Sequence, residues 1–148
     1  MTQAETQKTA QVRATHRYDA PPEQVFDAWL DPKIAGRFLF ATPTGQMVKA
    51  EIDARVGGHF NFTDRRPDMG DVEHVGTYLE IDRPRRLVFE FAVPAYDPTK
   101  TVVTVEIAPS GAGSELTLTH DGVFESYVTQ TRQGWGMILD GLAKALTS

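Results

Sequence analysis

Aromatic side chains are the residues of this 148-residue sequence whose types and spacing most suggest a binding chemistry. Sites for small molecules are mostly apolar and hold a few fixed polar groups, so a set of large rings with one imidazole fits such a site. Large rings also fill cores, and core filling is the expected role of most of them. The residues that we predict to line a cavity are Trp29, Phe38, Phe40, Phe60, Phe62, His74, Tyr78, Phe89, Phe91 and Trp135.

Histidines are the second group with chemical potential, and the chain has four of them: His16, His59, His74 and His120. Histidine and carboxylate side chains are common zinc ligands, and Asp71, Glu73 or Asp121 could complete a site. The spacings match no metal motif, however. We therefore expect hydrogen-bonded or exposed histidines, with no metal and no cofactor.

His74 and Tyr78 have the same parity on one predicted strand, so both could reach one cavity. Such a pair could orient a ligand carbonyl or act as acid and base. Structural hydrogen bonding is the alternative that we favour, and no residue is assigned a catalytic role. Ser114 and Ser126 have no base partner in the local sequence, which argues against a nucleophile.

Arginines form two further features. Arg55 with Asp53 could hold a carboxylate, although a structural pair at the glycine-rich turn that follows is the preferred interpretation. Arg83, Arg85 and Arg86 form a basic cluster in a chain of formal net charge −5, which favours a solvated turn. The net charge also argues against general nucleic-acid binding, which requires a basic face.

Composition narrows the class of protein further. Hydrophobic residues make up 41% and charged residues 24%, as in globular domains. The absence of cysteine excludes disulfides and thiolate chemistry. No apolar run approaches the ~20 residues that span a bilayer, and no signal peptide opens the chain. We expect a soluble, cytoplasmic protein with a tail at 1–10 and one domain at 11–148.

The elements that would position these residues follow from hydrophobic periodicity and turn residues. Alternation predicts strands at 12–18, 47–52, 59–62, 72–81, 87–92, 101–108 and 114–120, with glycine or proline between those that follow residue 47. Proline near residue 21 and at Pro32 predicts two short helices after the first strand. A stripe of apolar residues from Trp135 to Leu146 predicts a long helix at about 128–145. We predict an α+β fold.

Five local motifs follow one another along the chain: residues 20–29 (APPEQVFDAW), 53–60 (DARVGGHF), 76–89 (GTYLEIDRPRRLVF), 116–120 (LTLTH) and Gly134-Trp135. In this order they resemble the START-related, birch-pollen-allergen-like helix-grip superfamily (SRPBCC). More narrowly, they resemble the family named after the C-terminal domain of the activator of heat-shock protein 90 ATPase. The family's usual tryptophan after the second short helix is replaced by Phe38.

The resemblance implies a curved antiparallel sheet wrapped around the C-terminal helix, with an apolar cavity between them that is closed near the two short helices. It implies non-catalytic binding of a small hydrophobic molecule as the first function. The alternatives are a co-chaperone-like module whose partner is a chaperone and, ranked lower, a cyclase or dehydratase. We expect no nucleic-acid or membrane partner, and a monomer or homodimer.

Overall fold

One antiparallel sheet organises the computed structural model, of which residues 8–40, 44–68, 70–94 and 97–147 are described here. Its seven strands lie in the order β1-β7-β6-β5-β4-β3-β2. Every strand from β2 onward therefore pairs with its neighbour in the chain, and β1 closes the far edge against β7. The strands are β1 (Thr9–Tyr18), β2 (Gln46–Ile52), β3 (His59–Arg66), β4 (Gly70–Asp82), β5 (Arg86–Val93), β6 (Asp97–Ser110) and β7 (Gly113–Phe124).

Two short helices follow β1, as predicted. Helix α1 (Pro22–Leu30) begins with Pro22, whose ring fixes φ at a value compatible with the first helical turn. Helix α2 (Pro32–Phe38) is capped by Asp31, whose carboxylate accepts a hydrogen bond from the Lys33 backbone N–H at 3.0 Å. The chain thus restarts a helix within two residues of ending one.

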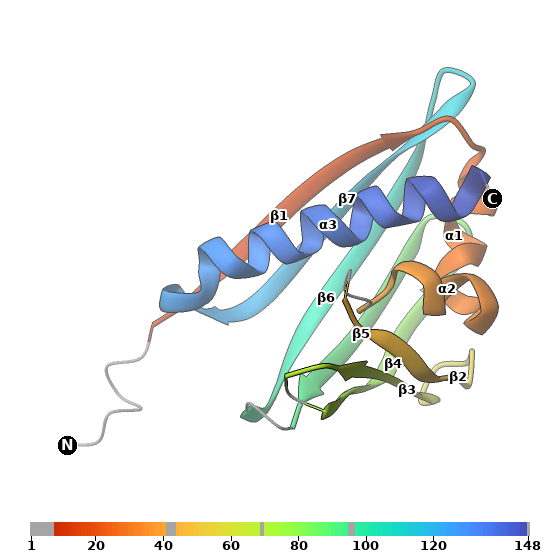
Figure 1. Cartoon of the computed structure of the whole chain (residues 1–148). Coiled ribbons are helices and arrows are strands. Elements are labelled where there is room, and N and C mark those ends of the chain that lie inside the picture. The colour runs from red at the N-terminus through yellow and green to blue at the C-terminus, as the bar shows by residue number, and fades with distance from the viewer. Residues whose placement is uncertain (1–7, 41–43, 69, 95–96, 148) are drawn as a thin grey trace.

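The long helix α3 (Val128–Thr147) lies across the concave side of the sheet, with α1 and α2 near its C-terminal end (Figure 1). It follows a 3-10 turn, η2 (Glu125–Tyr127). Its buried stripe is Trp135, Leu139, Leu142 and Ala145. The predicted α+β helix-grip architecture is confirmed. No helix in the described part of the chain is long and apolar enough to cross a membrane.

Two contacts fix the C-terminal half of α3. The Tyr18 hydroxyl donates a 2.9 Å hydrogen bond to the Leu139 carbonyl, which ties α3 to β1. Gly141 lies against Phe38 of α2, and a Cβ on Gly141 would lie 3.3 Å from the Phe38 Cβ. The absence of a side chain at residue 141 therefore sets the close approach of the two helices.

Gly76 serves close packing in β4 and not a bulge. The register of β4 against β5 shifts further along the strand, between Tyr78 and Glu80. A Cβ on Gly76 would overlap the Phe60 ring and the Glu90 carbonyl oxygen. Glycine is required there because the Phe60 ring lies directly over the β4 backbone.

Four strand boundaries differ from the predictions by three or more residues, one of them the start of β6 at Asp97 instead of residue 101. Strand β1 begins at Thr9, so residues 9 and 10 of the expected tail pair with β7, while residues 1–7 lie outside the described residues. Strand β3 continues to Arg66 because its polar end pairs with the start of β4. Strand β7 continues through Gly122 (φ 85°) to Phe124, since glycine adopts this backbone conformation without strain.

Candidate ligand-binding pocket

An open pocket of about 820 Å³ lies beside the first turns of α3. Its walls come from the ends of β3, β5 and β7, the start of β6, η2, and one residue of β4. None of its lining residues belongs to α1 or α2, which contact the other half of α3 (Figure 1). The lining comprises Arg66, His74, Phe91, Ala92, Val93, Thr99, Thr101, His120, Gly122, Val123, Phe124, Ser126, Tyr127, Gln130 and Thr131.

Two of the ten predicted cavity residues, His74 and Phe91, line this pocket. The other eight are buried in the hydrophobic core: Trp29, Phe38, Phe40, Phe60, Phe62, Tyr78, Phe89 and Trp135. Phe40 joins the two groups, because its ring stacks on His74 at 4.4 Å and lies 5.2 Å from Phe91. The predicted aromatic residues therefore form one continuous cluster, and one end of that cluster lines the pocket.

His74 is held as a neutral imidazole of known tautomer. Its Nδ1 lies 3.1 Å from the Phe62 carbonyl oxygen, which can only accept, so Nδ1 carries the proton. Burial lowers the pKa of His74 to about 4. The ring is therefore uncharged at neutral pH, and Nε2 holds a lone pair. Any hydrogen bond from this ring to a ligand must use Nε2 as an acceptor.

Tyr78 does not share this pocket with His74. Its ring packs against Phe60 at 5.4 Å and Phe89 at 6.4 Å, further along β4. Burial, and secondarily the charge of Asp53, raises the pKa of the Tyr78 hydroxyl well above its usual range. The hypothesis of a His74–Tyr78 pair orienting a ligand carbonyl lacks its geometry, since the second residue is elsewhere and the first cannot donate to a carbonyl through Nε2.

His120 forms the inner wall of the pocket together with two partners. The Trp135 indole N–H donates to His120 Nδ1 at 3.0 Å, so the imidazole proton is on Nε2. That N–H donates to Thr101 Oγ1 at 2.7 Å. Burial lowers the pKa of His120 to about 4, against the opposing charge of Asp121. This chain of hydrogen bonds ties the first half of α3 to β7 and β6.

The same tautomer limits what His120 can do chemically. A histidine that activates a hydroxyl must accept its proton, and His120 Nε2 already carries one. Thr101 is therefore not activated by this imidazole. Ser114, the other hydroxyl considered from the sequence, is buried and donates to the Ala20 carbonyl at 2.8 Å. Both contacts are structural.

Among the described lining residues, Arg66 is the one with a formal charge. Its Nε donates to Asp64 Oδ2 at 3.1 Å, and the Asp64 side chain is almost completely buried at 1% exposure. The two residues lie two positions apart on β3, on the same face, and form an ion pair at the pocket wall. Sequence reasoning missed them because Thr63, Asp64 and Arg65 end the hydrophobic alternation of β3. The sequence signal that could have identified this ion pair is a carboxylate two residues before an arginine.

Two further sequence hypotheses concern a metal site and the pair of Arg55 and Asp53. Among the described residues, no three histidine, aspartate or glutamate side chains group closely enough to hold a metal ion. The predicted pair of Arg55 and Asp53 is present, with Nε 2.8 Å from Oδ2.

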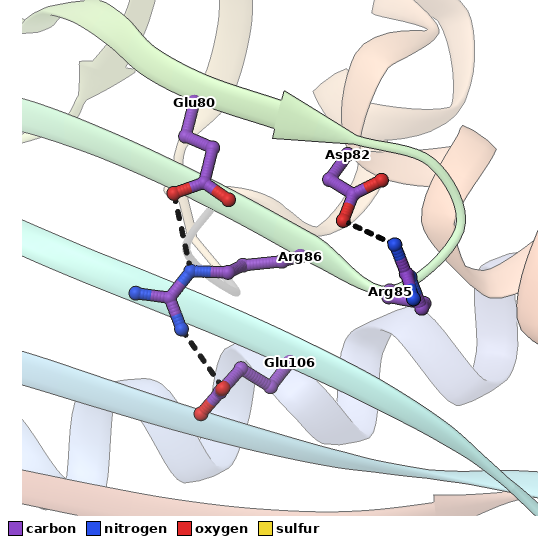
Figure 2. Close-up of polar contacts among 5 residues, drawn as sticks. All are labelled: Glu80, Asp82, Arg85, Arg86 and Glu106. Atoms are coloured by element: carbon purple, nitrogen blue, oxygen red, sulfur yellow. Dashed lines mark hydrogen bonds and ion pairs between the residues drawn. The ribbon is translucent and has the colours of Figure 1, made fainter.

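The basic cluster near Pro84 is neutralised by carboxylates. Arg86 lies between Glu80 and Glu106, with contacts of 3.2 and 2.9 Å, and Arg85 pairs with Asp82 at 2.9 Å (Figure 2). The third member, Arg83, makes two bonds of 2.7 and 2.9 Å to the Asp27 carboxylate of α1. Its guanidinium lowers the pKa of Asp27. The cluster holds the turn between β4 and β5 and attaches it to α1.

A curved seven-stranded sheet gripping a long C-terminal helix, with two short helices inserted after the first strand, places the chain in the helix-grip class. Within that class, the model of the family described as Activator of Hsp90 ATPase homolog 1-like protein matches residues 19–147. The chain therefore belongs to this family, as its motifs indicated.

Solved structures share this fold. A protein from Chromobacterium violaceum is 25% identical with a TM-score of 0.81, covering 93% of this chain and 97% of its own. The AHSA1-like protein from Aeromonas hydrophila is 24% identical with a TM-score of 0.80, covering 93% and 92%. A protein of unknown function from Staphylococcus aureus is 16% identical with a TM-score of 0.83, covering 95% of each chain. No curated protein sequence matches the chain.

Proposed function

We propose that this protein binds a small, largely apolar or aromatic molecule in the pocket beside the first turns of α3, without covalent chemistry. The observation that carries the proposal is the pocket itself, whose volume of about 820 Å³ lies in the range of small-molecule sites. Its wall combines the Phe91 ring with hydroxyl, amide and uncharged imidazole groups. The locked tautomer of His120 supports binding rather than catalysis.

Filling the pocket tests this proposal. Thr131 lines the pocket from α3, whereas Gln133 is an exposed residue of the same helix outside the lining. A tryptophan at residue 131 should occupy the space of a ligand, and a tryptophan at 133 should not. The probe is N-phenyl-1-naphthylamine, an uncharged dye whose fluorescence rises in apolar surroundings.

We expect wild type and Gln133→Trp to bind the dye equally, and Thr131→Trp to lose binding. Ligand at one hundred times its dissociation constant should also stabilise the wild-type fold by about 2.7 kcal/mol. No dye binding by wild type, or equal binding by Thr131→Trp, would contradict the proposal. In a separate experiment, native mass spectrometry of protein purified from its host would identify any retained natural ligand.

A second candidate function, interaction with a chaperone ATPase, is favoured by the family to which residues 19–147 belong. Its test is independent of the pocket. Purified protein would be added to the host Hsp90-type chaperone, and ATP turnover would be measured together with complex formation at micromolar concentrations. Stimulated turnover supports this function, and an unchanged rate without a complex excludes it.

A further inference from the structure

We propose that the pocket selects uncharged aromatic molecules bearing a hydroxyl or N–H donor, such as phenols, and that His74 Nε2 accepts the hydrogen bond from that donor. This inference rests on the proposed binding function and specifies its ligand class. It follows from three features of the lining: a fixed acceptor, an aromatic wall beside it, and the pairing of the one formal charge.

The fixed acceptor comes from the tautomer of His74. Its Nδ1–H is already committed to the Phe62 carbonyl at 3.1 Å, with the Val72 backbone as a further partner of the ring, so Nε2 is the nitrogen that keeps a lone pair. Turning the ring by 180° would keep its stacking on Phe40 but lose the hydrogen bond to the Phe62 carbonyl. A ligand that donates to Nε2 therefore pairs with the Nε2 lone pair, whereas a ligand that can only accept does not.

The aromatic wall lies beside this acceptor. The Phe91 ring lies 5.3 Å from the His120 ring, and both rings line the pocket. Phe40, a buried ring outside the lining, contacts Phe91 at 5.2 Å and His74 at 4.4 Å, so one ring connects the aromatic wall with the acceptor. An aromatic ligand packed on Phe91 can thus direct a substituent toward His74.

Charge pairing disfavours ionised ligands. Both pocket imidazoles are buried and uncharged, and Arg66 is paired at 3.1 Å with a carboxylate that is almost entirely buried. A ligand carboxylate would have to compete with Asp64 for the guanidinium. A ligand ammonium would meet no carboxylate among the described lining residues. Either ion would lose hydration without a new counter-charge.

Matched naphthalenes test the proposal in competition with the uncharged dye. 2-Naphthol donates a hydrogen bond, 2-methoxynaphthalene has the same oxygen without a proton to donate, and 2-naphthoate is an anion. We expect wild type to bind 2-naphthol about tenfold more tightly than 2-methoxynaphthalene, the effect of roughly one hydrogen bond to a buried acceptor. 2-Naphthoate should bind more weakly than 2-naphthol.

Two variants assign that preference to one atom. His74→Asn removes Nε2 and keeps an amide N–H that can donate to the Phe62 carbonyl in place of Nδ1–H. His16→Asn makes the same substitution on β1, outside the pocket lining. The naphthol preference should fall to near one in His74→Asn and persist in His16→Asn.

A readout on the unmodified protein covers the case in which His74→Asn does not fold. Nitrogen-15 NMR should show the His74 Nε2 resonance moving on addition of 2-naphthol and not on addition of 2-methoxynaphthalene. Equal affinities of the two neutral compounds for wild type, or tightest binding of 2-naphthoate, would overturn the selection rule and leave the proposed function standing. Failure of all three compounds and the dye to bind would overturn both.

Discussion

Two uncharged imidazoles buried at one pocket make the stability of this protein depend on pH in a defined direction. In the unfolded chain His74 and His120 titrate near the ordinary histidine pKa of 6.5, whereas burial lowers both to about 4 in the folded state. Between these values the unfolded chain binds more protons than the folded protein. The free energy of unfolding therefore falls as the pH falls from about 6.5 toward 4.

The magnitude follows from the displacement of each pKa. A shift from 6.5 to about 4 corresponds to about 3 kcal/mol per histidine when fully expressed, of which about 2 kcal/mol is expressed at roughly pH 5. The two groups together should remove about 4 kcal/mol between roughly pH 7.5 and 5. Asp27 acts in a lower window: its lowered pKa adds stability that disappears only as the pH falls below the ordinary aspartate value.

Urea unfolding followed by tryptophan fluorescence at these two pH values measures the effect. His120→Asn keeps an oxygen that can accept from the Trp135 indole but cannot titrate, so the loss of stability should fall by about half. Combining it with His74→Asn should leave little dependence on pH in this window. A wild-type free energy of unfolding that is unchanged between the two pH values would refute the reasoning, because it would mean that the folded imidazoles are protonated as readily as unfolded ones.

Two further substitutions test the packing of α3. Trp135→Phe leaves His120 Nδ1 buried without its donor, which should cost about 1–3 kcal/mol in urea unfolding; a cost below a few tenths would show that water replaces the indole. Gly136→Ala should raise Tm by about 3 °C, because a Cβ there meets nothing and alanine favours a helix by up to ~1 kcal/mol. Gly141→Ala should show no such gain, because its Cβ would crowd Phe38 at 3.3 Å. Equal rises in Tm for both glycines would contradict the packing argument.

The elements of this fold are largely encoded in local patterns. The alternation of Leu87, Phe89 and Phe91 indicates a strand with one buried face, and the structure buries all three. Proline at Pro22 and Pro32 marks two helix starts within one turn of their observed positions. Where local patterns failed, tertiary contacts decided: the polar end of β3 is a strand because β4 supplies its partners.

The pocket is less accessible to sequence reasoning. Its lining comes from the ends of several elements, and residues such as Thr101 and Gln130 carry no periodic signal that separates a pocket wall from a solvent-facing surface. His120 drew attention as a possible metal ligand, yet its role depends on Trp135, which only the fold brings within hydrogen-bond distance. The prediction selected residues by their aromatic type, and nine of the ten lie in the hydrophobic core, Phe91 among them.

The pairing of β1 with β7 has a consequence for the synthesis of this chain. Strands β3 to β7 can each pair with the strand made just before them as they leave the ribosome, but β1 pairs only with β7, the last strand of the sheet to be made. The hydrogen bond donated by the Tyr18 hydroxyl forms later still, because its acceptor is the Leu139 carbonyl of α3. A nascent chain that has not yet produced β7 therefore presents an unpaired first strand and an open sheet edge, the surfaces that holding chaperones recognise and through which partly made chains aggregate.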